Sequence, residues 1–94
     1  MRLLIVGDIV KLKIACLGNE EGSEGVVIEN YTIGDKSGAQ IIFENGEYDG
    51  FSLDDQEKFL ERIGHTKEFS EYRFTNVWKL SDDFANGRFD EIFE

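Results

Sequence analysis

The chain has one histidine, His65, and one cysteine, Cys16, so its candidate for nucleophilic chemistry is a Cys–His pair. Such a pair requires the thiol and the imidazole to be neighbours in the fold, with an acidic group orienting the imidazole. His65 follows Gly64 at the expected end of a helix, which is a position typical of surface loops. A structural zinc ion requires about four cysteine or histidine ligands, and the chain has two. We therefore expect no catalytic residue, no metal site and no cofactor.

Adjacent acidic residues occur three times, and such pairs could also bind Mg²⁺ or Ca²⁺: Asp54-Asp55, Asp82-Asp83 and Asp90-Glu91. Two of these pairs stand where helices are expected to begin, and the helix dipole favours carboxylates there without any metal. The chain contains no Asp-x-Asp-x-Asp-Gly calcium loop. The glycine-rich stretch 18–25 carries three glutamates and lacks the Lys-Ser/Thr of a phosphate-binding loop.

The strongest chemical feature of the sequence is its uneven charge. The 94 residues include 20 acidic and 10 basic side chains, which gives a formal net charge of −10. Residues 20–57 hold eleven of the acids and a single base, Lys36, so the whole excess lies in that stretch. This balance argues against direct binding of nucleic acid and against an anionic membrane surface.

If this stretch folds into neighbouring strands and loops, its carboxylates form a negatively charged face that can dock on a basic protein partner. The alternative is a solvated surface that only keeps the protein in solution. The candidate partner-binding residues are Glu20, Glu21, Glu24, Asp35, Glu44, Glu47, Asp49, Asp54 and Asp55.

Aromatic residues are numerous for so short a chain, at 13%. Most of the phenylalanines are expected in the core, whereas exposed Tyr and Trp make good interface anchors. Phe84, Phe89 and Phe93 near the C-terminus are candidates for a homodimer or partner contact. The aromatic residues that we consider as contacts are Tyr31, Tyr48, Trp78, Phe89 and Phe93.

Glycines and β-branched runs predict a mostly β fold with minor α, in one domain over residues 1–94. Asn45-Gly46 predicts a tight hairpin in which both central residues have positive φ. Ser52 predicts a helix cap, followed by a helix over 53–63. Residues 81–94 are expected to form a docked C-terminal extension with a short helical turn near 82–86. The expected strands, about five, are 8–14, 25–31, 39–43, 47–51 and 72–80.

The segments Gly7-Asp8-Ile9-Val10-Lys11-Leu12 and Gly22-Ser23-Glu24-Gly25-Val26-Val27 resemble the opening of SH3-like barrels of the KOW type. This resemblance implies a small SH3-like barrel. KOW domains that contact RNA are usually basic, whereas the loop between these two segments carries Glu20 and Glu21, so we do not carry over the nucleic-acid partner. Residues 51–64 and 72–84 are also loosely similar to small uncharacterised proteins of bacteria and phages, and this brings no activity.

These patterns favour a non-catalytic protein-interaction module, and the lone cysteine is typical of the cytoplasm. Taken with the loose resemblance to phage proteins, the most specific form of this hypothesis is a phage or mobile-element inhibitor that docks on a basic nucleic-acid-binding surface of a host protein. A second interpretation is a protein that binds or sequesters a small molecule or nucleotide, with Arg62, Tyr72, Arg73 and Trp78 converging on the ligand. A third is a small enzyme, which requires a pocket that joins His65 or Cys16 to a carboxylate.

Overall fold

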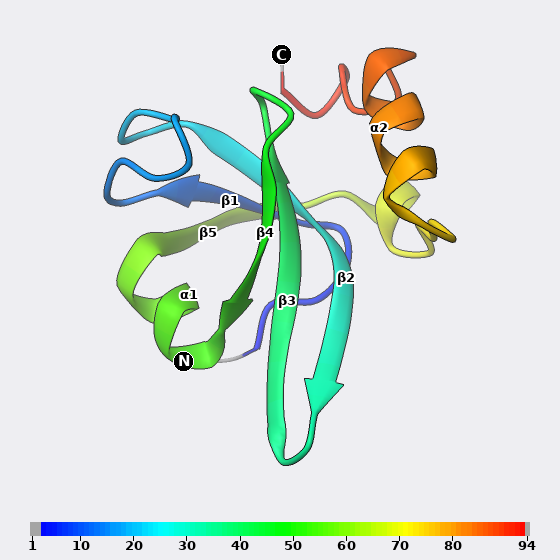
Figure 1. Cartoon of the computed structure of the whole chain (residues 1–94). Helices are drawn as coiled ribbons and strands as arrows, with labels where there is room; N and C mark the ends of the chain where they lie inside the picture. The colour runs from blue at the N-terminus through cyan, green and yellow to red at the C-terminus, as the bar shows by residue number, and fades with distance from the viewer. Residues whose placement is uncertain (1–2, 94) are drawn as a thin grey trace.

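The computed structural model describes residues 3–93 as one curled antiparallel sheet with helical segments at its ends (Figure 1). The strands are β1 (Asp8–Leu12), β2 (Glu24–Ile33), β3 (Lys36–Phe43), β4 (Tyr48–Ser52) and β5 (Leu60–His65). The helices are α1 (Leu53–Phe59), the short 3-10 helix η1 (Lys67–Phe69) and α2 (Val77–Ala85). The strand order is β4-β3-β2-β1-β5, which confirms the predicted mostly β fold and the number of strands but not the position of the fifth. Within residues 3–93, no helix is long and apolar enough to cross a bilayer.

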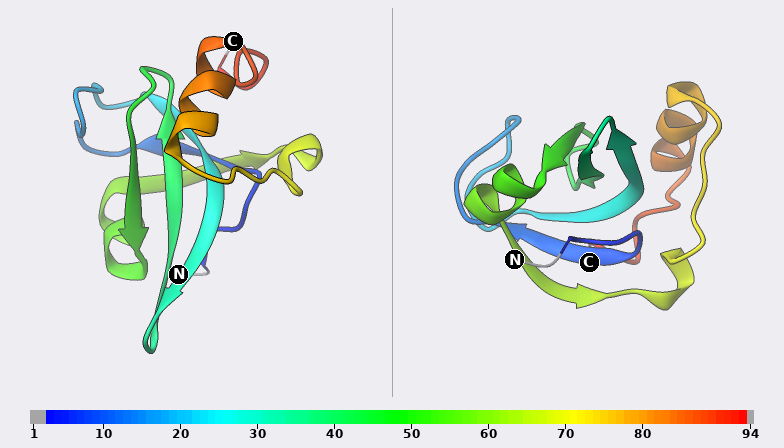
Figure 2. Two further views of the ribbon diagram at one scale, coloured as in Figure 1. Left: turned by 45° about the vertical axis from the view of Figure 1, so that its right-hand side comes forward. Right: turned by 90° about the horizontal axis from the view of Figure 1, so that it is seen from below.

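Two hydrophobic cores lie on opposite faces of the sheet. The inner core is enclosed by the curl of the sheet, and its buried members are Leu4, Val10, Leu12, Val27, Ala39, Ile41, Phe43, Phe51 and Leu60. The outer core joins β2 and β3 to the C-terminal segment, through Val26, Ile28, Ile42, Phe69, Tyr72, Leu80 and Phe89. Figure 2 shows residues 67–93 lying along one side of the sheet, away from α1. Alternation along β2 and β3 explains the arrangement, because successive strand residues point to opposite faces.

The predicted helix over 53–63 is correct at its start and wrong at its end. The Ser52 hydroxyl accepts a hydrogen bond from the amide of Asp55 at 3.2 Å, as expected for a helix cap. The helix ends at Phe59, because Leu60 adopts an extended backbone and pairs with Leu12 of β1. Pairing with β1 buries Leu60 in the inner core, and this outweighs the local helical spacing of the apolar residues.

The predicted strand over 72–80 is wrong. Residues 70–76 are irregular, and α2 begins at Val77, where the Asn76 side chain accepts a hydrogen bond from the amide of Lys79 at 3.0 Å. Leu80 and Phe84 lie one helical turn apart and pack into the outer core. This packing favours a helix of nine residues where the sequence indicated only a short turn near 82–86.

The turn at Asn45-Gly46 is a hairpin, but not the two-residue form predicted. The amide of Phe43 donates to the carbonyl of Glu47 at 2.8 Å, so the connection is longer. Only Gly46 has positive φ, at 89°, whereas the side chain of Asn45 accepts from the amide of Glu47 at 2.9 Å. This side-chain bond stabilises the longer turn, in which Asn45 keeps a negative φ.

Two strand glycines, Gly25 and Gly38, lie at close approaches that leave no room for a Cβ, and the approach at Gly38 is the tighter. A Cβ at position 38 would overlap the Tyr31 ring and lie 2.8 Å from the carbonyl oxygen of Phe51. Gly64, also in a strand, provides a matched control, because a Cβ there would lie 4.0 Å from Ile9.

We expect Gly38→Ala to lower the free energy of unfolding by about 1–3 kcal/mol, because it forces an overpacked contact. Gly64→Ala should change it by less than about 1 kcal/mol, because the added methyl group meets no close neighbour. Urea denaturation of both variants measures the difference. Equal stability of the two variants would contradict the packing of Tyr31 over β3.

Candidate functional site

The loop between β1 and β2 packs on the turn between β3 and β4. The side chain of Asn45 donates to the carbonyl of Leu17 at 3.1 Å. The amide of Glu44 donates to the carbonyl of Glu24 at 3.1 Å, and a Glu44 carboxylate oxygen accepts from the amide of Glu24 at 3.4 Å. These contacts bring the acidic residues of the loop beside those of the turn.

Two further carboxylates extend this group towards Cys16. Burial raises the pKa of the Cys16 thiol, and the negative charges of Asp49 on β4 and Asp55 on α1 raise it further. A thiol with a raised pKa is a poor nucleophile at neutral pH. We call the combined surface the acidic end, and its residues are Glu20, Glu21, Glu24, Glu44, Glu47, Asp49 and Asp55.

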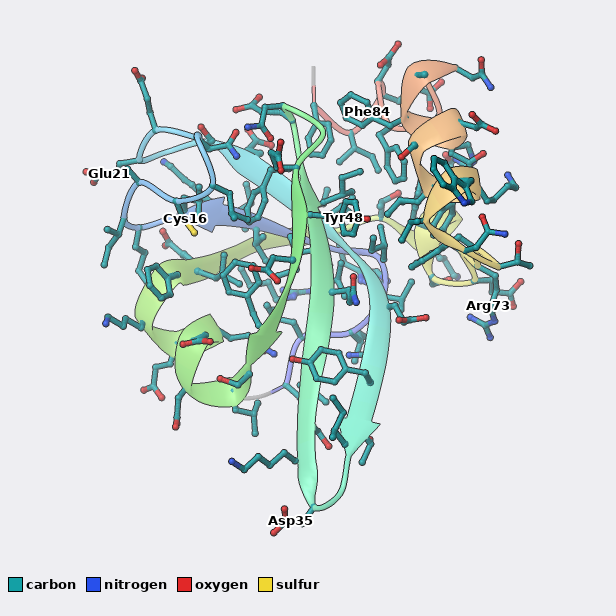
Figure 3. All side chains as sticks on the ribbon, in the orientation of Figure 1. Cys16, Glu21, Asp35, Tyr48, Arg73 and Phe84 are labelled. Carbon is teal, nitrogen blue, oxygen red and sulfur yellow. The ribbon has the colours of Figure 1, made fainter. Side chains whose placement is uncertain are left out.

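Asp35 and Asp54 lie outside the acidic end. Both line a shallow depression of about 330 Å³ where the tip of the β2–β3 hairpin approaches the start of α1, together with Lys36. Figure 3 shows Asp35 at the far tip of this hairpin, at the opposite end of the molecule from Glu21. The nine predicted partner-binding residues therefore divide into a group of seven and a group of two.

The carboxylates of the acidic end are not neutralised by the protein itself. The ion pairs within residues 3–93 join Asp8 to Arg62 and to His65, and Asp83 to Lys79. None of them involves the acidic end. Six of its seven residues are exposed, and Glu24 is half-buried. Unpaired charges of one sign at one end of a small protein create a local potential that attracts cations and basic surfaces.

The predicted aromatic contacts differ widely in exposure. Trp78 on α2 is 76% exposed and Tyr48 on β4 is 36% exposed. Tyr31 is half-buried over Gly38 and Gly50, and Phe93 is half-buried against the outer core. Phe89 is 1% exposed, so its assignment as a contact residue is wrong. It is a core residue because its ring packs between those of Phe69, Tyr72 and Phe84.

Two of the four residues considered for a small ligand, Tyr72 and Arg73, line one cleft, and Arg62 and Trp78 do not line it. Arg62 binds Asp8, whereas the hydroxyl of Tyr72 donates to Asp83 at 2.7 Å. Burial and this hydrogen bond raise the pKa of Tyr72. The cleft that Tyr72 and Arg73 line has a volume of about 320 Å³ and lies against β2. The structure therefore does not bring the four together in one pocket.

A buried charge cluster around Asp8 was not predicted from the sequence. This carboxylate is fully buried, and one of its oxygens accepts from Arg62 Nε at 3.2 Å and from His65 Nδ1 at 2.8 Å. The other oxygen accepts from the amide of Ile5 at 3.0 Å. Burial by itself raises the pKa of Asp8, but the hydrogen bonds from Ile5, His65 and Arg62 outweigh burial and hold the pKa below its ordinary value.

A signal for this cluster is present in the sequence. Asp8 shares its period-two face with Val10 and Leu12, and a carboxylate on an inward face requires hydrogen-bonding partners. His65 pairs with Asp8 across β1 and β5, so it belongs to a strand rather than to the loop that was predicted.

The candidate nucleophilic pair, Cys16 and His65, has different acidic neighbours. Cys16 lies near Asp49 and Asp55, whereas His65 binds Asp8. Within residues 3–93, no three potential ligands gather for a metal ion.

Replacing Asp8 with Asn tests this cluster. Because the pKa of Asp8 in the folded protein lies below its ordinary value of 3.8, the charged carboxylate stabilises the fold above that pH. We expect D8N to lower the free energy of unfolding by about 2 kcal/mol at neutral pH, since hydrogen bonds to a charged group are lost. Denaturation at several pH values measures the difference in the free energy of unfolding between D8N and the wild type. This difference should shrink as pH falls through the lowered pKa of Asp8. A difference that stays constant through this range would contradict the assigned role.

No protein-family model, curated protein or solved structure matches the chain. Function must therefore be inferred from the residues and from their geometry.

Proposed function

We propose that the chain is a non-catalytic protein-interaction module whose acidic end docks on a basic surface of a protein partner. The observation that carries this proposal is the packing of the β1–β2 loop on the β3–β4 turn, which concentrates carboxylates from separate parts of the chain. None of these carboxylates has an ion-pair partner within residues 3–93. Their mutual repulsion destabilises the isolated protein, and a cationic partner relieves it.

The same proposal includes an SH3-like barrel. The strand order supports it, because β5 returns to pair with β1 after a short helix that follows β4. The resemblance of the β1 and β2 segments to KOW-type openings points to the same barrel. In this arrangement the β1–β2 loop and the β3–β4 turn lie at one end of the barrel, which is where the acidic end forms.

We further propose that the partner surface is one that binds nucleic acid, and that the protein acts there as an inhibitor. Nucleic-acid-binding surfaces present clustered Lys and Arg for phosphates, and exposed carboxylates can occupy the same positions. Tyr48 supports such a contact, because it is exposed and lies between Glu47 and Asp49 in the chain. An exposed tyrosine can stack on a guanidinium group of the partner.

Removing charge from the acidic end should weaken the complex. The triple variant Glu44→Gln, Glu47→Gln, Asp49→Asn keeps side-chain size and removes three exposed charges. A control variant, Glu61→Gln, Glu71→Gln, Asp82→Asn, removes the same number of exposed charges elsewhere. With a partner captured from host extract and then purified, we expect an affinity loss on the order of tenfold or more for the first variant, and little loss for the control. Equal losses for the two variants would overturn the assignment of this face.

The complex should also be sensitive to salt. Raising the salt concentration from ~0.1 M to ~1 M shortens the screening length to ~3 Å, so an interface built on exposed charges loses most of its attraction. Titration calorimetry at several salt concentrations measures this dependence. Affinity that is unchanged over the range would mean that another surface makes the contact.

A further inference from the structure

A cleft of about 410 Å³ lies between the end of β5, η1 and the C-terminal segment, and it shares no residue with the acidic end. This volume falls within the range of small-molecule sites in proteins. Its apolar floor consists of the half-buried Ile9 and Ile92, whereas Phe69, which also lines it, is only 3% exposed. His65, held in place by Asp8, forms part of its wall.

The charged rim of this cleft carries both signs, with Lys67 and Arg88 as cations and Glu68 and Glu91 as carboxylates. None of the four forms an ion pair within residues 3–93. Arg88 is nevertheless fixed in position, because its guanidinium lies 4.2 Å from the centre of the Phe69 ring. The rim therefore presents two cations and two carboxylates without an ion-pair partner among residues 3–93.

A ligand that matches this cleft has an anionic group, a cationic group and an apolar part. We propose that the cleft binds a free α-amino acid with an apolar side chain. Its carboxylate meets Arg88 and Lys67, its ammonium group meets Glu68 and Glu91, and its side chain covers the apolar floor. A simple anion fits less well, because it would be desolvated beside two carboxylates without any compensating cation of its own. This site is independent of the acidic end and of its proposed protein partner.

Three probes with the same phenyl ring test the proposal on the full chain. L-Phenylalanine carries both charged groups, 3-phenylpropionate carries only the carboxylate, and 2-phenylethylamine carries only the ammonium group. In amide NMR titrations we expect phenylalanine to give saturable shifts at residues 65–69 and 88–92, with at least about tenfold weaker binding of the other two probes. No saturable shift with phenylalanine, or equal binding of all three probes, would overturn the proposal.

Variants of the exposed rim distinguish the two halves of the ligand. Lys67→Ala should weaken binding of phenylalanine but not of phenylethylamine, and Glu91→Ala should weaken binding of phenylalanine but not of phenylpropionate, because each substitution removes a charge that repels the single-charge probe. Lys36→Ala is the control, since it removes an exposed lysine outside the cleft. Because these side chains are exposed and lie outside both cores, the variants should fold. Affinities for phenylalanine that match in the rim variants, the control and the wild type would contradict the site.

Discussion

The structure depends on a sheet that is apolar on both faces. β2 and β3 send Val27 and Ile41 into the inner core and Val26, Ile28 and Ile42 to the outer face. An antiparallel sheet commonly leaves one face to solvent, and here that face would expose several large apolar side chains. Burying each such side chain contributes roughly 1.5–3 kcal/mol, so the outer face favours a covering layer. Residues 67–93 supply this layer through Phe69, Leu80 and Phe89, which explains why an otherwise β chain ends in helical segments.

This covering also affects where the acidic residues lie. With both faces of β2 and β3 occupied by apolar side chains, all but one of the carboxylates of residues 20–57 lie on loops, turns, strand ends or α1, and Glu29 is the exception. The β3–β4 turn connects the outer core to the acidic end. Its Gly46 lies beneath Phe84 of α2, where a Cβ would come within 3.1 Å of the ring, and its Asn45 donates to Leu17 of the β1–β2 loop. The outer core thus helps to hold the turn against which the acidic end forms.

The sequence predicted the elements that local signals determine. Period-two alternation located β1, glycine-bounded β-branched runs located β2 and β3, and the Asn45-Gly46 turn located β4. Ser52 located the start of α1. It could not locate β5, because the apolar spacing from Leu53 to Ile63 suits a helix and only pairing with β1 makes Leu60 extended. The acidic composition of residues 20–57 is plain from the sequence, but which of its carboxylates gather at the acidic end is not. That grouping depends on the contact between Asn45 and Leu17, which joins residues 28 positions apart. The Asp8 cluster also joins distant residues, and it was overlooked although Asp8 lies in phase with Val10.

The central claim is that the acidic end takes the place of nucleic acid on a basic protein. Competition tests it most directly: a labelled oligonucleotide is bound to the purified partner, and its fluorescence anisotropy is followed as the chain is added. We expect the chain to displace the oligonucleotide, and we expect the variant that lacks the charges of Glu44, Glu47 and Asp49 to displace it much less. Simultaneous binding of the chain and the oligonucleotide to the partner would contradict the claim.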